Sequence, residues 1–368
     1  MIKTAKTILL LALVALASVA GCTEKPGGAE LLMERLEASV ARGVIMYGHQ
    51  DDLVYGHTWQ VLDAAADDFS RSDVKAVCGN YPAVLGLELG ELELGGEKNL
   101  DGVPFDVITR AAQEHYARGG IVSFSWHPRN PLTGGTAWDV SSDKVVESIL
   151  DGGEKRELFL QWLQMLGDFF DTIRTPDGER IPFIFRPWHE HTGSWFWWGR
   201  DLCTTEQFVE LFRETREYLT VTRGMDNILW CYSPNVGVDA EGYMERWPGD
   251  DQVDIMGFDC YAFMGPDGPK AASVQFNAYL KESLGFVQRL GEEHGKLITL
   301  SETGFQSIPD STWWTEALYP AIKDYPIAYV LTWRNAPDDP PHFYAPWPGS
   351  GDAEDFEAFT ELEKIVLL

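Results

Sequence analysis

Basic residues are scarce in this chain. Lys and Arg total 29 against 57 Asp and Glu, which gives a formal net charge of −28. A protein that binds nucleic acid needs clustered Lys and Arg to contact phosphates, so this composition argues against nucleic acid as a partner. The same acidity favours solubility and disfavours a strongly anionic ligand.

Cysteine is scarce as well, with five residues in the whole chain. None of them forms a CxxC pair, which argues against a zinc ribbon. Cys78, Cys203, Cys231 and Cys260 fall in predicted helices or strands, where buried free thiols are common. Whether any of these cysteines pair is left open by the sequence.

The N-terminus has the pattern of an export signal. Two lysines precede a short apolar run from Ile8, and the small residues VAG lead to Cys22. The run is too short for a membrane span, and its ending resembles a bacterial lipobox, in which the cysteine is lipidated and the preceding residues are removed. We expect a lipoprotein signal peptide at residues 1–21, a lipid-anchored tether at 22–35 and a place in the cell envelope, on either membrane face. A plain secretory signal is the alternative.

The chain also lacks a glycine-rich phosphate loop after its first predicted strand, and no low-complexity linker follows residue 30. Instead, eight short, continuously apolar runs alternate with amphipathic helical segments. These strand candidates are residues 44–50, 83–89, 121–127, 181–190, 228–234, 253–261, 297–304 and 327–335. The pattern predicts an α/β fold, a single (β/α)8 TIM barrel over residues 36–368. A doubly wound open sheet is the alternative, but that fold usually needs the missing phosphate loop.

Helix signals support the same alternation. The clearest predicted helices are residues 104–120, 204–224 and 351–368. The second begins at Thr204 or Thr205 and ends at Gly224, which are common start and stop residues. The connection from residue 49 to about residue 71 is long and polar, and long loops in compact domains are usually functional.

Polar and aromatic residues gather where the predicted strands end, which is where a TIM barrel places its active site. They are His49, His127, Glu190, Asn235, Asp259, Tyr261, Glu302 and Trp333. Few of these residues would be chosen for packing. Two of them, Glu190 and Glu302, are carboxylates at the fourth and seventh strands.

A pair of carboxylates across a barrel mouth suits glycoside hydrolysis, in which one carboxyl protonates the departing oxygen and the other attacks the sugar or activates water. The two roles need opposite protonation states, so the surroundings must separate the two pKa values. We expect desolvation among aromatic rings to keep Glu190 protonated. Tyr261 or Arg186 would keep Glu302 ionised through hydrogen bonds. The alternative is a purely structural role, in which each Glu forms a salt bridge at the end of its strand.

Tryptophan is concentrated around one of these acids. The segment FRPWHEHTGSWFWWGR, residues 185–200, holds four of the chain's 14 tryptophans. Trp195, Trp197 and Trp198 follow Gly193 and Ser194 in a predicted loop, whereas Trp162 belongs to an apolar helix and is assigned to packing. Aromatic faces stack on sugar rings, so Trp195 and Trp198, together with Asn235, are candidate substrate-binding residues.

The triplet His189, Glu190 and His191 also suggests a metal site. Along a strand, the two histidines would point one way and Glu190 the other. At most two of the three could therefore bind one ion, although His49 and His127 could supply further ligands. We expect no metal, and His191 is expected to be a scaffold residue.

Several segments together resemble glycoside hydrolase family 26, whose members are mostly β-mannanases. RPWHEHTGSWFWWG (186–199) resembles the acid/base motif of that family, and LSETG (300–304) its nucleophile motif. YGHQDDLVYG (47–56), SWHPRNP (125–131), FDCY (258–261) and LTWRNA (331–336) are also similar, so the resemblance spans nearly the whole mature chain. With its lipobox, the chain resembles the lipoprotein members of the family that are found in Bacteroidota.

The resemblance implies a clan A barrel, a retaining mechanism and no cofactor. By position, Glu190 would be the acid/base and Glu302 the nucleophile, with a hydrogen bond from Tyr261. His127, His189, Trp195 and Trp333 would line the subsite that holds the sugar being cleaved. Asp259 would support them.

The implied substrate is β-1,4-mannan, galactomannan or glucomannan, cleaved by a monomer. The family also contains enzymes that act on mixed-linkage β-glucan or β-1,3-xylan. A protein of another class, a glycan-binding lipoprotein on an inactive hydrolase scaffold, remains an alternative. Such a scaffold usually lacks one of the two carboxylates, and this sequence has both Glu190 and Glu302.

Overall fold

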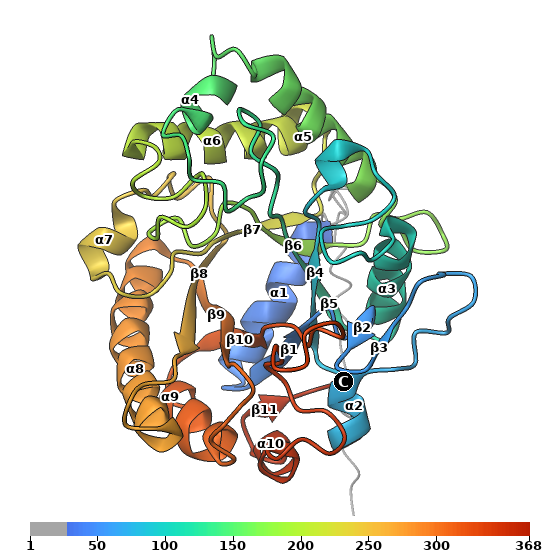
Figure 1. The fold of residues 1–368 in the computed structure, drawn as a ribbon, viewed down its shortest axis with the longest axis vertical. Helices are drawn as coiled ribbons and strands as arrows, with labels where there is room; N and C mark the ends of the chain where they lie inside the picture. Colours follow the sequence, from blue (N-terminus) through green and yellow to red (C-terminus); the bar gives the residue numbers. More distant parts are fainter. Residues whose placement is uncertain (1–27) are drawn as a thin grey trace, which may run out of the picture.

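A computed structural model describes residues 28–368 of the chain. Eight parallel strands form a closed barrel, with helices around it (Figure 1). The strands are β1 (Ile45–Gln50), β4 (Val84–Glu88), β5 (Ile121–Ser125), β6 (Phe183–Arg186), β7 (Ile228–Tyr232), β8 (Ile255–Ala262), β9 (Leu297–Phe305) and β10 (Ile327–Thr332). Neighbours in the sequence are neighbours in the sheet, and β10 pairs with β1 to close it. The predicted TIM barrel is confirmed, and no strand extends more than one residue beyond its predicted segment.

The main connecting helices have sequence signals that explain their limits. They are α2 (Asp73–Cys78), α3 (Phe105–Ala117), α4 (Val145–Ile149), α5 (Arg156–Phe170), α6 (Thr205–Glu217), α7 (Ala240–Met244), α8 (Pro269–His294), α9 (Tyr319–Ile322) and α10 (Ala353–Thr360). Thr204 caps α6 in a capping box with Gln207, which satisfies the free N–H groups of the first turn. Trp162, on α5, is buried as predicted.

Three shorter helical turns accompany them, η1 (Leu92–Leu94), η2 (Tyr218–Thr222) and η3 (Trp314–Leu318). The helix predicted over residues 351–368 is shorter than expected. It ends at Thr360, and β11 (Ile365–Val366) then pairs with β1. The long first connection contains a small hairpin, β2 (Tyr55–Gly56) with β3 (Trp59–Gln60).

The N-terminal boundary of the fold differs from the prediction. Residues 28–35, expected in a tether, belong to helix α1 (Gly28–Ala41). Leu32 and Leu36 are buried in a cluster with barrel residues such as Ile184 and Leu229, and α1 is visible through the barrel in Figure 1. Burial of these leucines holds the helix against the barrel, so 28–35 are part of the folded domain. The expected signal peptide, Cys22 and the rest of the tether lie outside the described residues.

Two features of residues 28–368 bear on earlier expectations. Cys78, Cys203, Cys231 and Cys260 are free thiols, three of them buried. No helix in this part of the chain is both long and apolar enough to cross a lipid bilayer.

Candidate active site

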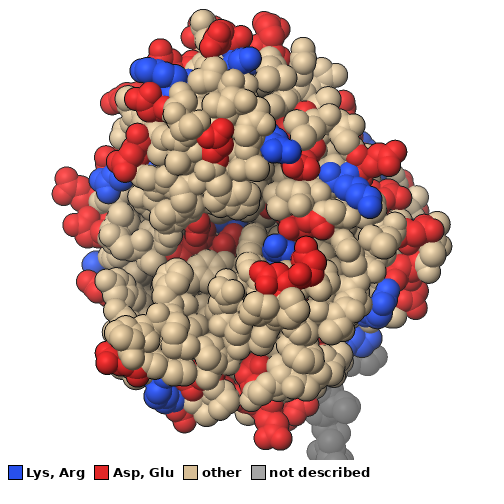
Figure 2. All heavy atoms as spheres, in the orientation of Figure 1, with Lys and Arg blue, Asp and Glu red and all other residues tan. Residues whose placement is uncertain are grey.

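A hollow opens at the carboxyl ends of the strands, with acidic residues at its base (Figure 2). The pocket measures about 240 Å³. Its walls are His127, Trp138, His189, Glu190, Trp195, Phe196, Tyr261, Ala262, Phe263, Glu302, Gln306, Trp333, His342 and Tyr344. The two predicted catalytic carboxylates and five of the predicted sugar-binding residues therefore meet in one pocket.

Strand pairing brings three of the key side chains together. Asp259 of β8 lies opposite Glu302 of β9 in the parallel register, just after an irregularity at Phe258. Tyr261 lies two residues beyond Asp259 and so faces the same side of the sheet. Its hydroxyl donates a hydrogen bond of 2.8 Å to Oε2 of Glu302.

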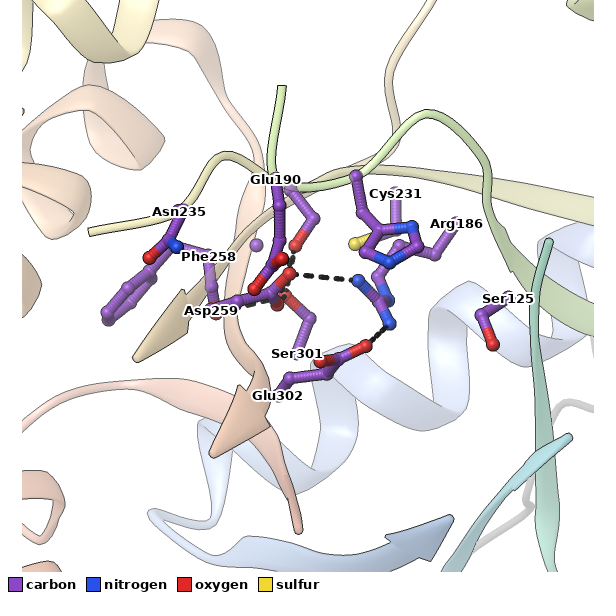
Figure 3. A network of polar contacts seen from close by, with 12 residues as sticks. Ser125, Arg186, Glu190, Cys231, Asn235, Phe258, Asp259, Ser301 and Glu302 are labelled. Carbon is purple, nitrogen blue, oxygen red and sulfur yellow. Dashed lines mark hydrogen bonds and ion pairs between the residues drawn. The ribbon is translucent and has the colours of Figure 1, made fainter. Parts of the chain in front are cut away.

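Arg186, the last residue of β6, lies between two carboxylates (Figure 3). Its guanidinium donates 3.0 Å to Asp259 and forms a short hydrogen bond to Oε1 of Glu302. All three side chains are at most 5 % exposed, so the ion pairs are little screened by solvent. Glu302 thus has both of the hydrogen-bond donors that the sequence suggested as alternatives.

Asp259 lies below the pocket wall and contacts other buried side chains. It has no exposed surface, and it accepts hydrogen bonds from Ser233 at 2.8 Å and Ser301 at 2.9 Å besides Arg186. These bonds fix the guanidinium in place. Its expected supporting role is consistent with this geometry.

Glu190 is placed by a turn that follows β6, because the strand itself stops at Arg186. Trp188 and Glu190 both have left-handed backbone angles, with φ of 54° and 53°, which are uncommon for residues other than glycine. The Glu190 N–H donates 2.7 Å to the carbonyl of Ser233, which ties the turn to the segment after β7. Such strained turns persist only where surrounding contacts hold them, and they cluster at active sites.

The two glutamates lie close together in contrasting surroundings. Glu190, Asp259 and Glu302 each offer an oxygen within 4.8 Å of the others. Burial, followed by the negative charges of Asp259 and Glu302, raises the pKa of Glu190 well above its usual range. This raised pKa favours the protonated form of Glu190, whereas Glu302 accepts hydrogen bonds from Tyr261 and Arg186.

Two histidines form a buried chain at one wall of the pocket. The Nε2 atoms of His189 and His127 are 3.0 Å apart, and Nδ1 of His127 is 2.8 Å from Glu88 at the end of β4. Burial alone would raise the pKa of Glu88, but the His127 ring and hydrogen bonds from Ser125 and the backbone lower it to about 2. Burial, then the positive charge of Arg186, keeps the pKa of His189 far below its usual value. Neutral His189 therefore faces the pocket beside an ion-paired His127.

The His-Glu-His triplet does not converge on one point, and its predicted geometry is wrong. His189 points to His127, whereas His191 packs against Phe208 at 4.2 Å and Tyr232 at 4.7 Å between ring centroids. The two histidines were expected to share a side, but the left-handed turn breaks the strand alternation. Packing of His191 among aromatic rings agrees with a scaffold role.

The carboxylates offer the other arrangement that could bind a metal ion. Glu190, Asp259 and Glu302 are near enough to bind one ion together. Arg186 already pairs with two of them. A positive guanidinium between the carboxylates repels a second cation, so the cluster suits proton transfer better than metal binding.

The tryptophans divide into pocket and core. Trp195 is 40 % exposed, lines the pocket and donates 2.7 Å from Nε1 to Glu190. Trp198 is fully buried, stacked on Phe196 with its Nε1 bonded to the carbonyl of His189, so its prediction as a sugar-binding residue is wrong. Trp197 is buried as well. The sequence could not separate them because all three lie in one irregular loop.

The chain is similar to proteins whose folds and sites are known. The family profile described as glycosyl hydrolase family 26 matches residues 28–303. The chain belongs to this family. A solved GH26 β-mannanase from Bacteroides ovatus is 45 % identical, and the match covers 93 % of this chain and 95 % of that one with a TM-score of 0.87. A modular endo-β-1,4-mannanase from Cellulomonas fimi is 30 % identical over 92 % of this chain and 75 % of its own, with a TM-score of 0.80.

A curated relative extends the comparison. The mannan endo-1,4-β-mannosidase of Bifidobacterium adolescentis is 31 % identical over 336 residues, which is 86 % of this chain. This family 26 chain spans 33 % of the length of that enzyme and 55 % of a Bacillus subtilis relative of the same description.

Some wall residues of this family 26 pocket were not predicted. Trp138 stacks on His127 with ring centroids 5.3 Å apart and is 49 % exposed. The sequence feature that could have indicated Trp138 is the presence of a tryptophan in a glycine- and threonine-rich loop. His342 and Tyr344 come from the loop after β10, where nothing in the sequence separates wall from core.

Two predicted residues lie away from the pocket wall. The backbone of Asn235 pairs with Asp259 and with the Thr192 side chain, while sugar binding by its own side chain stays a prediction. His49, at the end of β1, is fully buried with Nδ1 2.8 Å from Asp52.

Proposed function

We propose that this family 26 chain hydrolyses β-1,4-mannosidic bonds with retention of anomeric configuration. The observation that carries the proposal is the pair Glu190 and Glu302, whose oxygens lie within 4.8 Å of each other. Retaining glycosidases hold their carboxyl groups about 5–5.5 Å apart, whereas inverting enzymes leave about 6.5–9.5 Å for a water molecule. Mannan, galactomannan and glucomannan are the proposed substrates, because the similar proteins are described as mannanases.

The reaction follows from the two protonation states. Ionised Glu302 attacks the anomeric carbon while Glu190 gives its proton to the departing oxygen, so the glycosidic bond breaks as the enzyme–sugar bond forms. Glu190, now ionised, takes a proton from water, and the oxygen of that water displaces Glu302. Each carboxyl returns to its starting state. Two displacements at one carbon give retention.

The wall residues have roles in holding the sugar. Trp333 lines the pocket beside His127, with ring centroids 6.2 Å apart, and would stack on the sugar whose glycosidic bond is cleaved. His189, His127 and Trp195 surround the same space with neutral or donor groups. We assign them to binding the sugar whose bond breaks, because they lie around the carboxylate pair.

The test is product analysis on mannan, galactomannan, glucomannan, lichenan and β-1,3-xylan. We expect turnover on the three mannans, with β-configured product seen first by NMR. An α product would contradict retention, and turnover confined to lichenan or β-1,3-xylan would contradict the substrate. Binding of mannan without turnover would instead support the glycan-binding alternative.

We further propose a lipid anchor at Cys22 and a monomeric enzyme in the cell envelope. Support for the anchor comes from the sequence, where small residues precede Cys22 after a signal-like apolar run. Wild-type protein expressed in a bacterium should incorporate labelled palmitate and enter the detergent phase, and Cys22→Ala should not. A wild-type protein that is wholly soluble after signal cleavage would contradict the anchor, and a dimer by sedimentation would contradict the monomer.

A further inference from the structure

A second pocket adjoins the catalytic one. It measures about 310 Å³ and is bounded by the segment after β7, the end of β8 and the first turns of α8. It shares Tyr261, Ala262 and Phe263 with the catalytic pocket. The two pockets therefore share the wall that these three residues form, and Phe263 lines both of them.

Phe263 is unusually exposed for so large an apolar side chain. Its exposed fraction is 76 %, and Tyr279 on the far wall is 49 % exposed. Among the residues that the structure describes, no aromatic ring packs on Phe263, so its ring is available to a ligand. Exposed apolar residues that gather beside a pocket commonly mark a binding surface.

The second pocket is electrically neutral. None of the residues that line it is charged, although the chain has a net charge of −28. Gln275 and Tyr279 supply an amide and a hydroxyl, and Phe263 supplies an apolar face. Figure 2 shows the surface between the hollow and α8, to the left of the hollow, made of uncharged residues. This combination suits a neutral, hydroxylated sugar better than an ion.

The position of the second pocket relative to the acid/base indicates which part of a glycan it would hold. The Glu190 N–H donates a hydrogen bond to the carbonyl of Ser233. The Thr192 hydroxyl donates to the backbone carbonyl of Asn235 and accepts from its backbone N–H. The next residues along this segment, 236 and 237, line the second pocket. The second pocket therefore lies next to the segment that the Glu190 loop contacts, on the side where the leaving group departs after Glu190 protonates it.

We propose that Phe263 and the second pocket bind sugar units of the leaving part of a neutral β-linked hexose chain, beyond the unit next to the cleaved bond. This inference rests on the proposed function. Phe263 stacks on one sugar, and Gln275 and Tyr279 hydrogen-bond the next. Short substrates without these units gain nothing from the pocket, so Phe263 discriminates by chain length.

The kinetic test compares two substrates in Phe263→Ala. On mannohexaose we expect kcat/KM to fall about tenfold, mostly through KM, which corresponds to about 1.4 kcal/mol. On an aryl glycoside with the same non-reducing sugars and no leaving sugar, kcat/KM should stay within about twofold. Phe263→Trp should restore mannohexaose cleavage. Val274→Ala is the matched control, because Val274 is 64 % exposed nearby on α8 but does not line the pocket.

A binding test separates this inference from the proposed function. In a Glu302→Ala background, calorimetry with mannohexaose should show about tenfold weaker binding when Phe263→Ala is added. If the wild-type chain cleaves no mannan but Phe263→Ala still weakens mannohexaose binding, the proposed function is overturned and the proposed binding site stands. Equal losses on both kinetic substrates, or no loss on mannohexaose and no change in binding, would overturn the site.

Discussion

At the scale of single residues, the site makes two glutamates behave differently. Glu302 accepts hydrogen bonds from Tyr261 and Arg186. Glu190 receives one, from Trp195, and is otherwise surrounded by buried negative charge, which favours its protonated form. The roles proposed for them, nucleophile for Glu302 and acid for Glu190, rest on this difference between their neighbours.

This contrast predicts different defects in the two alanine variants. Glu302→Ala should abolish turnover of every substrate, because no nucleophile remains. Glu190→Ala should still cleave an activated aryl glycoside in the first step, and its glycosyl-enzyme should accumulate. Azide should relieve that block and give a β-glycosyl azide, identified by NMR. An α-azide, or aryl-glycoside activity in Glu302→Ala, would show that the roles are assigned wrongly.

The Trp195 hydrogen bond predicts a shift in pH dependence. Its donation to Glu190 stabilises the ionised carboxylate and so lowers the pKa of Glu190. Trp195→Phe removes the donor, which should raise that pKa. Because the first step needs protonated Glu190, the alkaline limb of kcat/KM should move to higher pH.

Trp138→Phe is the control for this shift. Trp138 lines the same pocket but stacks on His127 and has no bond to Glu190. Its replacement should leave the alkaline limb in place. A limb that moves to lower pH in Trp195→Phe would contradict the assignment of Glu190 as the acid.

At the scale of elements, Glu88 ties the end of β4 to the end of β5. Its carboxylate accepts hydrogen bonds from the backbone N–H groups of Gly90 and His127 and from the Ser125 hydroxyl, and it pairs with the His127 ring. The side chain is buried. These contacts fix the loop that carries His127 into the pocket.

Because the pKa of Glu88 is lowered, the stability that these contacts contribute depends on pH. The pKa is about 2 in the folded protein, against a usual 4.5. The stabilisation is therefore present above about pH 4.5 and is lost as pH falls toward 2, and a shift of this size corresponds to about 3 kcal/mol. By urea denaturation, Glu88→Gln should cost about that much at pH 7, and the difference from wild type should shrink at pH 3.

Glu93→Gln is the control, because burial raises the pKa of Glu93. A raised pKa weakens the folded state as pH rises. The free energy of unfolding of the wild type relative to Glu93→Gln should therefore increase from pH 7 to pH 3, whereas relative to Glu88→Gln it should decrease. A Glu88→Gln cost that is constant from pH 7 to pH 3 would contradict the ion-paired state of Glu88.

At the scale of the whole molecule, the barrel collects side chains from six strands and their loops into one site. Glu88 and Arg186 lie 98 positions apart in the sequence, and Arg186 and Glu302 lie 116 apart. In the fold, Glu88 contacts the pocket residue His127, and Arg186 contacts Glu302. Closure between β1 and β10 fixes the distances across the mouth. A rigid closed sheet therefore sets the separation of Glu190 and Glu302 better than loops alone would.

The same arrangement predicts independence from metal ions. Arg186 already supplies the positive charge among the three carboxylates, and neither step of the proposed reaction needs an ion. Activity on mannan should therefore survive dialysis against EDTA unchanged. Loss of activity that returns with zinc but not with buffer would contradict this.

The sequence alone determined the barrel, its eight strands and the two carboxylates, because continuous apolar runs and residues at strand ends are local patterns. The motif that contains Glu190 was long enough to indicate the family. The sequence also suggested Tyr261 or Arg186 as a hydrogen-bond donor to Glu302, and the structure shows both bonds.

Only the tertiary structure decided which side chains face the sugar. Trp195 and Trp198 lie three positions apart in one loop, yet one lines the pocket and the other is core, because irregular backbone has no fixed side-chain period. The left-handed angles at Trp188 and Glu190 separate His189 from His191 for the same reason. The pairing of Glu88 with His127 and the position of Phe263 in the wall of both pockets depend on contacts between distant segments, and local sequence does not encode such contacts.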